Sequence, residues 1–352
     1  LVGSEMCIRD REWNVACLDE AHIIKNRGAK TSAAAMKIQA KNRIMLTGTP
    51  VQNHLGELWN LFQFVNPGLL GSYEHFSRKF IIPIEGNKDK EKQEMLDDLV
   101  HPFMLRRTKQ SVLKELPEKT EIYQDIELTK DELAIYESIR IRAEKLLNDN
   151  RGDVNMNVLA EITRLRQAAC SAELIEPKWV GECSKITTLT ELLQGVIEGG
   201  NRALVFSQFV SFFHVVKREL DKLHIDYFYI DGSVPVKKRT EMVNAFQSGE
   251  KSVFLISLKA GGLGLNLTGA NYVFHLDPWW NPAIEQQATD RAYRIGQNQA
   301  VTVYHLVSKH TIAEKIIRLH ETKRELAENI LDGTDISYKL TGSELLKMLQ
   351  TD

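Results

Sequence analysis

The sequence predicts an α/β protein with two lobes, each built on a parallel sheet, and a mainly helical insertion between them. Short apolar runs alternate with helical patterns near the start of the chain and again from residue 203 onward, as they do in parallel sheets. The stretch between them, more than 120 residues, has helical periodicity and is too long for a simple linker. A length of 352 residues suits two domains plus an insertion, at roughly 150 residues per domain.

Composition excludes several classes of protein. The chain has 45 Lys and Arg, 47 Asp and Glu, and a formal net charge of −2, so any basic surface for a polyanion must be local. No apolar stretch approaches the roughly 18–20 residues that cross a bilayer, and we expect no membrane span. Four cysteines without a C-x-x-C pair argue against a disulfide scaffold or a zinc site, and they favour an intracellular compartment.

The first lobe is predicted from residues 12–60. Residues 1–11 (LVGSEMCIRDR) show neither strand alternation nor helical periodicity, and we expect them to be a non-native leader. A buried strand is expected at 13–18, directly followed by the acidic segment 19–22 (DEAH). A helical stretch leads to a second buried strand at 43–46, which ends in the turn sequence TGTP at 47–50. Acidic residues at the carboxyl end of a parallel strand stand where open α/β sheets bind ligands.

Residues 61–183 are predicted to be the helical insertion. Apolar residues recur at helical spacing from residue 55 to 65, from 131 to 147 and from 158 to 172. The polar stretch 85–98 is expected to be a solvated loop or helix face.

A complete second lobe is predicted at residues 184–311. Five apolar runs indicate parallel strands with helices between them, at 203–206, 227–230, 253–257, 272–276 and 301–307. Residues 312–331 form an amphipathic pattern typical of a helix, and a short polar tail follows to residue 352.

Three segments carry residues suited to nucleotide chemistry. Asp19 and Glu20 are adjacent carboxylates. In such a pair, one carboxylate can hold Mg²⁺ through its waters while the other orients an attacking water. An adjacent Asp-Glu pair is nevertheless most often surface charge. The glycine-rich loop 260–266 would permit close backbone approach to a ligand, although isolated glycine loops have many structural explanations. Gln287, Arg291 and Arg294 recur at spacings of four and three, so on a helix both guanidinium groups would point the same way, as suits a phosphate.

Five motifs in order resemble motifs II to VI of superfamily two helicases. They are DEAH at 19–22, LTGTP at 46–50, LVFSQF at 204–209, SLKAGGLGLNLTGANYVFHLDPWWNP at 257–282 and QATDRAYRIGQ at 287–297. The wording of LDPWWNP and RAYRIGQ is similar to the Swi/Snf family of ATP-dependent DNA translocases in particular. The resemblance implies tandem RecA-like lobes, the first truncated and the second complete, with 312–331 as a brace helix. It also implies a motor that couples ATP hydrolysis at the lobe interface to movement on double-stranded DNA.

The resemblance also implies roles at single positions. Asp19 would bind the magnesium of Mg-ATP through water, Glu20 would position the attacking water, and His22 would couple the nucleotide site to the second lobe. Arg291 and Arg294 would reach the γ-phosphate. The other expected nucleotide-site residues are Gly262, Gly264, Asn266 and Gln287. Thr47, Gly48 and Thr49 would link the ATP state to the grip on DNA.

Further DNA contacts are predicted along a basic track, because phosphate contacts dominate sequence-tolerant affinity. The candidates are Lys237, Lys238, Arg239, Lys259 and Trp279. A solvated helix start explains residues 237–239 equally well, and one of the two tryptophans at 279 and 280 is expected to pack in the interior. The protein that such a motor displaces could be a nucleosome or RNA polymerase, in a bacterial cytoplasm or a eukaryotic nucleus.

One motif is missing. A P-loop, G-x-x-x-x-G-K-[ST], is expected upstream of DEAH, and none occurs in the sequence. We therefore expect the chain to be a fragment that binds ATP poorly and hydrolyses it negligibly by itself, and we expect its second lobe to fold alone better than its first. Two alternatives remain open: a non-catalytic DNA-binding or scaffold protein that lacks the P-loop, and an RNA or DNA unwinding helicase.

Overall fold

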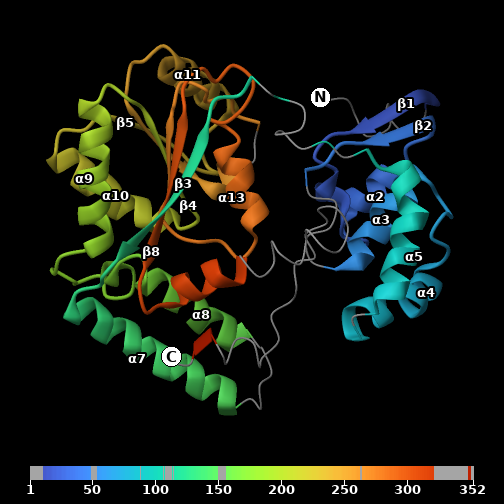
Figure 1. The fold of residues 1–352 in the computed structure, drawn as a ribbon, viewed down its shortest axis with the longest axis horizontal. Helices are drawn as coiled ribbons and strands as arrows, with labels where there is room; N and C mark the ends of the chain where they lie inside the picture. The colour runs from blue at the N-terminus through green and yellow to red at the C-terminus, as the bar shows by residue number, and fades with distance from the viewer. Residues whose placement is uncertain are drawn as a thin grey trace. The chain divides into compact units, whose positions relative to one another are not determined.

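The computed structural model divides the chain into two compact units, each described by itself below (Figure 1). The first unit comprises residues 1–107 and 321–339, and the second comprises residues 108–320 and 340–352. The residues that the structure describes are 11–48, 54–87, 89–105, 107, 113, 115–149, 156–261, 264–320 and 348–349. The predicted leader at 1–11 lies outside this part of the chain except for Arg11. No helix in the described ranges has the length and apolar character needed to cross a membrane.

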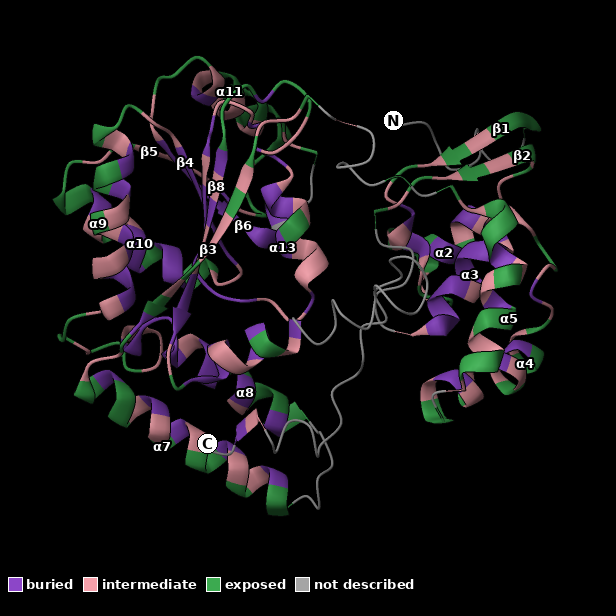
Figure 2. Ribbon diagram, viewed as in Figure 1, coloured by how far each residue is buried: buried purple, intermediate pink, exposed green. Residues whose placement is uncertain are grey.

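The first unit contains a β-α-β arrangement with two parallel strands, as predicted. Strand β1 (Trp13–Leu18) pairs in parallel with β2 (Ala40–Met45), and the chain between them forms η1 (Ala21–Ile24) and α2 (Lys30–Met36). The expectation of buried strands is wrong here, because the side chains of β1 and β2 are all exposed or half-buried (Figure 2). Val15 is 51% exposed and Ile44 is 48% exposed. In a two-stranded sheet each strand has one neighbour, which leaves the other edge open.

The rest of the first unit is helical. Helix α3 packs its apolar side chains against those of the helices that follow it, in a core that includes Leu58, Phe76 and Leu96. The polar stretch 85–98 largely falls on α5, which buries Leu96 and Val100 and exposes most of its charged residues. The elements are α3 (Leu55–Val65), α4 (Tyr73–Phe76), η2 (Ser77–Gly86), α5 (Lys90–Val100) and η3 (His101–Phe103).

The second unit is built on a parallel sheet of six strands rather than the five predicted. Their order is β3-β8-β7-β4-β6-β5, and every neighbouring pair is parallel. The additional strand comes from the stretch that was predicted to be helical insertion. The strands are β3 (Lys119–Ile126), β4 (Ala203–Ser207), β5 (Tyr227–Ile230), β6 (Val253–Ser257), β7 (Tyr272–His275) and β8 (Val301–Ser308).

The compact units divide the chain at a different place from the predicted domains. The compact units meet at residues 107 and 108, whereas the prediction placed the start of the second lobe at 184. Strand β3 pairs along its whole length with β8, from Lys119 opposite Val301 to Ile126 opposite Ser308. Its half-exposed, charged sequence did not resemble the apolar central strands, because β3 lies at the edge of the sheet.

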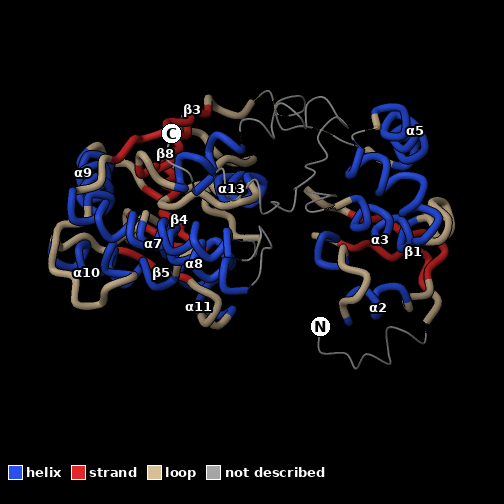
Figure 3. The backbone as a smooth tube through the Cα atoms, turned by 90° about the horizontal axis from the view of Figure 1, so that it is seen from below, coloured by secondary structure: helices blue, strands red, loops and turns tan. Residues whose placement is uncertain are grey.

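Helices cover both faces of the six-stranded sheet (Figures 1 and 3). One face packs against α9 and α10 through residues such as Leu189 and Phe212. The other face packs against α11 and α13 through Phe246 and Ala288. The helices of this unit are α7 (Lys130–Asp149), α8 (Met156–Ala168), η4 (Ala172–Leu174), α9 (Ser184–Glu198), α10 (Val210–Lys222), α11 (Val236–Gln247), α12 (Leu258–Gly261) and α13 (Pro282–Thr289).

Helices α7 and α8 pack against the start of the predicted brace helix. Residues 312–320 are helical, and Ile312 and Ile316 join Tyr136 and Leu165 in one apolar cluster. The hydroxyl of Tyr136 accepts a hydrogen bond of 2.7 Å from the backbone N–H of Ile312. Residues 321–331 of the predicted helix lie outside the described residues.

Candidate functional site

The acidic motif lies at the carboxyl end of β1, where the strand pattern predicted it. Asp19 is exposed, and its Oδ1 accepts a hydrogen bond of 2.9 Å from the backbone N–H of Glu20. Glu20 has a left-handed backbone with φ of 50°, an uncommon conformation for a residue other than glycine. Its Oε2 lies 3.3 Å from Nδ1 of His22. The first unit thus presents two carboxylates and an imidazole at one strand end.

The second strand of the same sheet ends beside this motif. The backbone N–H of Ala21 donates to Leu46 O at 3.0 Å, and that of Leu46 donates to Leu18 O at 2.8 Å. Thr47 lies two residues after the end of β2 and is half-buried, and Gly48 is exposed. Thr49 lies outside the described residues. The structure accordingly brings DEAH and the first residues of TGTP to one edge.

In the second unit, the glycine-rich loop 260–266 is hydrogen-bonded to the arginine segment, which is residues 287–297 and carries Arg291 and Arg294. The backbone N–H of Leu267 donates to Arg291 O at 3.0 Å, and Nη1 of Arg294 donates to Leu265 O at 3.5 Å. Gly264 adopts a φ of +70°, which favours glycine, and Asn266 is exposed. Gly262 lies outside the described residues, as does the side chain of Lys259. Two predicted motifs that are far apart in sequence thus form one structure.

The arginines do not lie on a helix, contrary to the spacing argument. Helix α13 ends at Thr289, and the residues that follow form turns, with a φ of +97° at Gly296. Gln287 is half-buried on α13, while Arg291 and Arg294 follow the helix. The prediction that the three residues share one helical face is therefore wrong, although both arginines stay hydrogen-bonded to the loop that follows the glycines.

Helix α13 is held on the sheet by two polar contacts. Oε2 of Glu285 lies 3.5 Å from Nδ1 of His305 on β8. Oγ1 of Thr289 lies 2.9 Å from Nε2 of His275 on β7. Oε1 of Glu285 also accepts a hydrogen bond of 2.5 Å from the backbone N–H of Trp279. Each of these contacts connects α13 to a different segment of the second unit.

The two histidines belong to a ladder of stacked rings across four strands. Phe206, His275, His305 and Tyr123 lie opposite one another on β4, β7, β8 and β3. Their ring centroids are 5.6, 5.1 and 4.8 Å apart in that order. This stacking holds both imidazoles in a fixed orientation beneath α13.

Burial and neighbouring charges set the protonation of these groups. Burial lowers the pKa of His275 to about 4, although Glu285 acts in the opposite direction. Burial would raise the pKa of Glu285, but the hydrogen bond from His305 and the nearby His275 outweigh it and lower that pKa. At neutral pH His275 is therefore neutral and Glu285 is ionised where α13 contacts the sheet.

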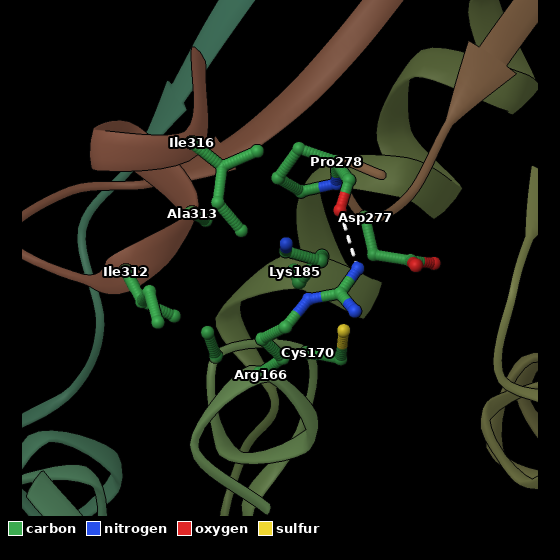
Figure 4. Close-up of a pocket in the computed structure, with 9 residues that line it drawn as sticks. Arg166, Cys170, Lys185, Asp277, Pro278, Ile312, Ala313 and Ile316 are labelled. Atoms are coloured by element: carbon green, nitrogen blue, oxygen red, sulfur yellow. Dashed lines mark hydrogen bonds between the residues drawn. The ribbon is translucent and has the colours of Figure 1, made fainter. Parts of the chain in front are cut away.

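A second buried cluster lies at the carboxyl ends of β7 and β8 (Figure 4). Nη2 of Arg166 donates to Pro278 O at 2.6 Å, and Lys185 Nζ donates to the carbonyls of Leu276 and Leu306 at 2.9 and 3.1 Å. Asp277 accepts a hydrogen bond of 2.5 Å from Ser207 Oγ. Burial raises the pKa of Asp277, and Arg166 acts against that rise. Arg166, Lys185 and Asp277 help to line a cavity of about 10 Å³, which is the size of one water.

Two of the predicted DNA contacts are engaged within the protein. The indole of Trp279 lies against the guanidinium of Arg166, with Cζ 5.3 Å from the ring centroid, so the structure gives Trp279 a packing role. Nη2 of Arg239 donates to the carbonyls of Asp231 and Gly232 at 3.3 and 3.2 Å. Lys237 and Lys238, on the same turn of α11, are exposed.

Sequence reasoning missed the polar residues that support the motifs. Arg166 and Lys185 lie in helical stretches, and His275 and His305 lie in apolar strands. The one available signal was a charged or titratable residue inside an otherwise apolar run, which is rarely buried without a partner. No group of three metal-binding side chains occurs in the part of the chain that the structure describes.

Two domain families match this chain. Residues 3–174 match the SNF2-related domain, and residues 184–296 match the helicase conserved C-terminal domain. The chain is 37% identical over 342 residues to the putative ATP-dependent helicase/translocase YwqA of Bacillus subtilis, covering 95% of this chain and 37% of that protein. It is 34% identical to the DNA repair and recombination protein RAD26 of Saccharomyces cerevisiae, covering 91% of this chain and 32% of that protein. The chain spans about a third of the length of these curated relatives.

A solved structure extends the likeness to the fold. The SWI2/SNF2 ATPase core of Sulfolobus solfataricus, in complex with dsDNA, is 33% identical to this chain with a TM-score of 0.55. The match covers 99% of this chain and 75% of the archaeal one. The predicted pair of RecA-like α/β lobes is thereby confirmed. The chain belongs to the SWI2/SNF2 family of ATP-dependent helicases and translocases.

Proposed function

We propose that the protein containing this chain hydrolyses ATP between its two lobes and uses that energy to move along double-stranded DNA. The observation that carries the proposal is the tie between the glycine loop and the arginine segment, through Leu267 N–H to Arg291 O and Arg294 Nη1 to Leu265 O. These bonds join a loop open to close backbone approach to the backbone of Arg291 and the guanidinium of Arg294, and guanidinium groups are suited to an anionic phosphate.

In this proposal the first unit supplies the acid chemistry. Asp19 would hold Mg²⁺ through water, and Glu20 would orient the attacking water. Asp19 is exposed and its carboxylate offers oxygen donors, which fits an ion that keeps several of its waters. Magnesium would offset the charge of the phosphates when bound with ATP. His22, at 3.3 Å from Glu20, would carry the state of the nucleotide toward the second lobe.

The second unit would act on the phosphate that is transferred to water. Arg291 and Arg294 would stabilise the charge that develops on the γ-phosphate, an effect worth about 10³ to 10⁵ in rate for such residues. The remaining nucleotide-site positions in the proposal are Gly262, Gly264, Asn266 and Gln287.

Contact with DNA is proposed through the phosphate backbone. Lys237 and Lys238 are exposed at the start of α11 and can each neutralise a phosphate, so binding should weaken steeply with salt. Thr47, Gly48 and Thr49 would sense the DNA beside the nucleotide. Lys259 stays a candidate, and Arg239 would help indirectly by bracing the loop before α11. Movement along DNA would displace a DNA-bound protein, such as a nucleosome or RNA polymerase. This would take place in a bacterial cytoplasm or a eukaryotic nucleus.

The 352-residue chain alone should hydrolyse ATP negligibly, because its sequence holds no G-x-x-x-x-G-K-[ST]. The same observation favours the second candidate, a non-catalytic DNA-binding or scaffold protein. The motor requires a P-loop, whose backbone amides and lysine bind the phosphates of ATP, and the scaffold protein lacks one.

DNA-stimulated ATP hydrolysis tests the proposal. We would measure kcat for the protein containing this chain, with any sequence upstream of residue 1, alongside Glu20→Gln and Arg294→Ala. We expect hydrolysis that rises with duplex DNA and falls at least 100-fold in each variant. DNA binding without hydrolysis in the unaltered protein would support the scaffold, and unchanged turnover in both variants would refute the site.

A further inference from the structure

We infer that three buried side chains and one half-buried side chain form a seat that fixes the arginine segment, and that they are positioning residues for ATP hydrolysis. The α13 seat consists of Glu285 and Thr289 on the helix, His275 on β7 and His305 on β8. The inference rests on the proposed function for its effect on turnover. Its geometry stands on the contacts alone.

The two helix residues attach α13 at two points. Glu285 and Thr289 are four residues apart, so they share one helix face, and both are buried, at 4% and 3% exposure. One contacts His305 on β8 and the other contacts His275 on β7. Attachment to two neighbouring strands fixes both the position and the rotation of this eight-residue helix.

The seat also fixes the chain that enters the helix. Glu285 accepts a hydrogen bond from the backbone N–H of Trp279, and the side chain of Asn281 caps the helix by accepting from Ala283 N–H at 3.0 Å. Glu285 therefore joins three segments: the loop after β7, the helix itself and β8. Its removal would leave the half-buried N–H of Trp279 without its acceptor.

Thr289 connects the seat directly to the arginine segment. Its hydroxyl contacts His275, while its carbonyl accepts hydrogen bonds from the N–H groups of Ala292 and Tyr293 at 3.0 and 3.1 Å. These two bonds shape the turn that contains Arg291. A displacement of Thr289 would thus be transmitted through the backbone to the arginines.

His275 has little freedom to find another partner. Its ring is 2% exposed and stacks between Phe206 and His305. Nδ1 of His275 has no hydrogen-bond partner among the described residues, so Thr289 supplies the hydrogen bond of this ring. Removing the Thr289 hydroxyl therefore breaks one attachment of the seat without removing a large side chain.

Turnover of the protein containing this chain provides the first test. Thr289→Val keeps the shape of the side chain and removes the hydroxyl, whereas Thr289→Ser keeps the hydroxyl. We expect Thr289→Val and Glu285→Gln to lower kcat about tenfold with KM for ATP within about twofold, because arginines that act on the transition state affect kcat. Thr289→Ser should stay within about twofold of the unaltered kcat. Gln286→Ala, an exposed neighbour on α13, is the matched control.

Hydrogen exchange provides a readout that does not need ATP hydrolysis. In the 352-residue chain, peptides covering 282–297 should exchange faster in Thr289→Val and Glu285→Gln, and unchanged in Thr289→Ser and Gln286→Ala. Unaltered kcat and unaltered exchange in both Thr289→Val and Glu285→Gln would overturn the seat. If the unaltered protein does not hydrolyse ATP, the proposed function fails, and the exchange result alone then decides whether the seat holds the segment.

Discussion

Acidification should destabilise the second unit through His275. The ring is buried, and its pKa in the folded protein is lowered to about 4 from an ordinary value of 6.5. Above pH 6.5 the ring is neutral in both the folded and unfolded chain. As pH falls from 6.5 toward 4, the unfolded chain takes up a proton that the folded protein does not, so the free energy of unfolding falls. At pH 4.5 this amounts to about 2–3 kcal/mol.

Urea denaturation at pH 7.5 and 4.5, followed by tryptophan fluorescence, measures this loss. His275→Gln removes the titrating ring, and we expect its free energy of unfolding to fall by about 2–3 kcal/mol less than that of the unaltered chain. His214→Gln, at an exposed position on α10, is the control and should follow the unaltered chain. Equal losses in His275→Gln and the unaltered chain would refute the assignment of a buried neutral imidazole.

Three further predictions concern stability. Lys185→Met leaves the carbonyls at the ends of β7 and β8 without their donor, and we expect a loss of about 2–4 kcal/mol by urea denaturation; no loss would contradict a stabilising role of these two hydrogen bonds. Asn60→Leu removes hydrogen bonds to Ile24 O and Ser32 Oγ, at a cost of about 1–3 kcal/mol, which faster hydrogen exchange in residues 21–36 would reveal. Tyr136→Phe removes the acceptor for Ile312 N–H and should speed exchange at 312–320, whereas unchanged exchange there would exclude the bond.

The central strands of the second unit could be predicted because their environment is uniform. Residues 203–207 and 253–257 are buried throughout, and strands buried on both faces have continuous apolar sequences. Strand β3 could not be found in this way, because its edge position permits charged residues such as Glu121. The buried character expected of β1 also failed, since burial depends on neighbouring elements that the strand's own sequence does not specify.

The positions of the candidate-site motifs along the chain could be predicted from residue type and order, but their geometry could not. Carboxylates after a strand, a glycine loop and paired arginines could be recognised by their order. The helical spacing of Arg291 and Arg294 was misleading because α13 ends at Thr289. The α13 seat could not be predicted, since His275 and His305 come together only through the pairing of β7 with β8.

The most direct test of the proposed motor is the displacement of a third DNA strand from a triplex by the protein containing this chain. A protein that moves along duplex DNA removes the third strand without separating the duplex, and an unwinding helicase separates the duplex. We predict ATP-dependent release of the third strand, an intact duplex, and no release by Glu20→Gln. Duplex unwinding, or third-strand release that persists in Glu20→Gln, would contradict the account.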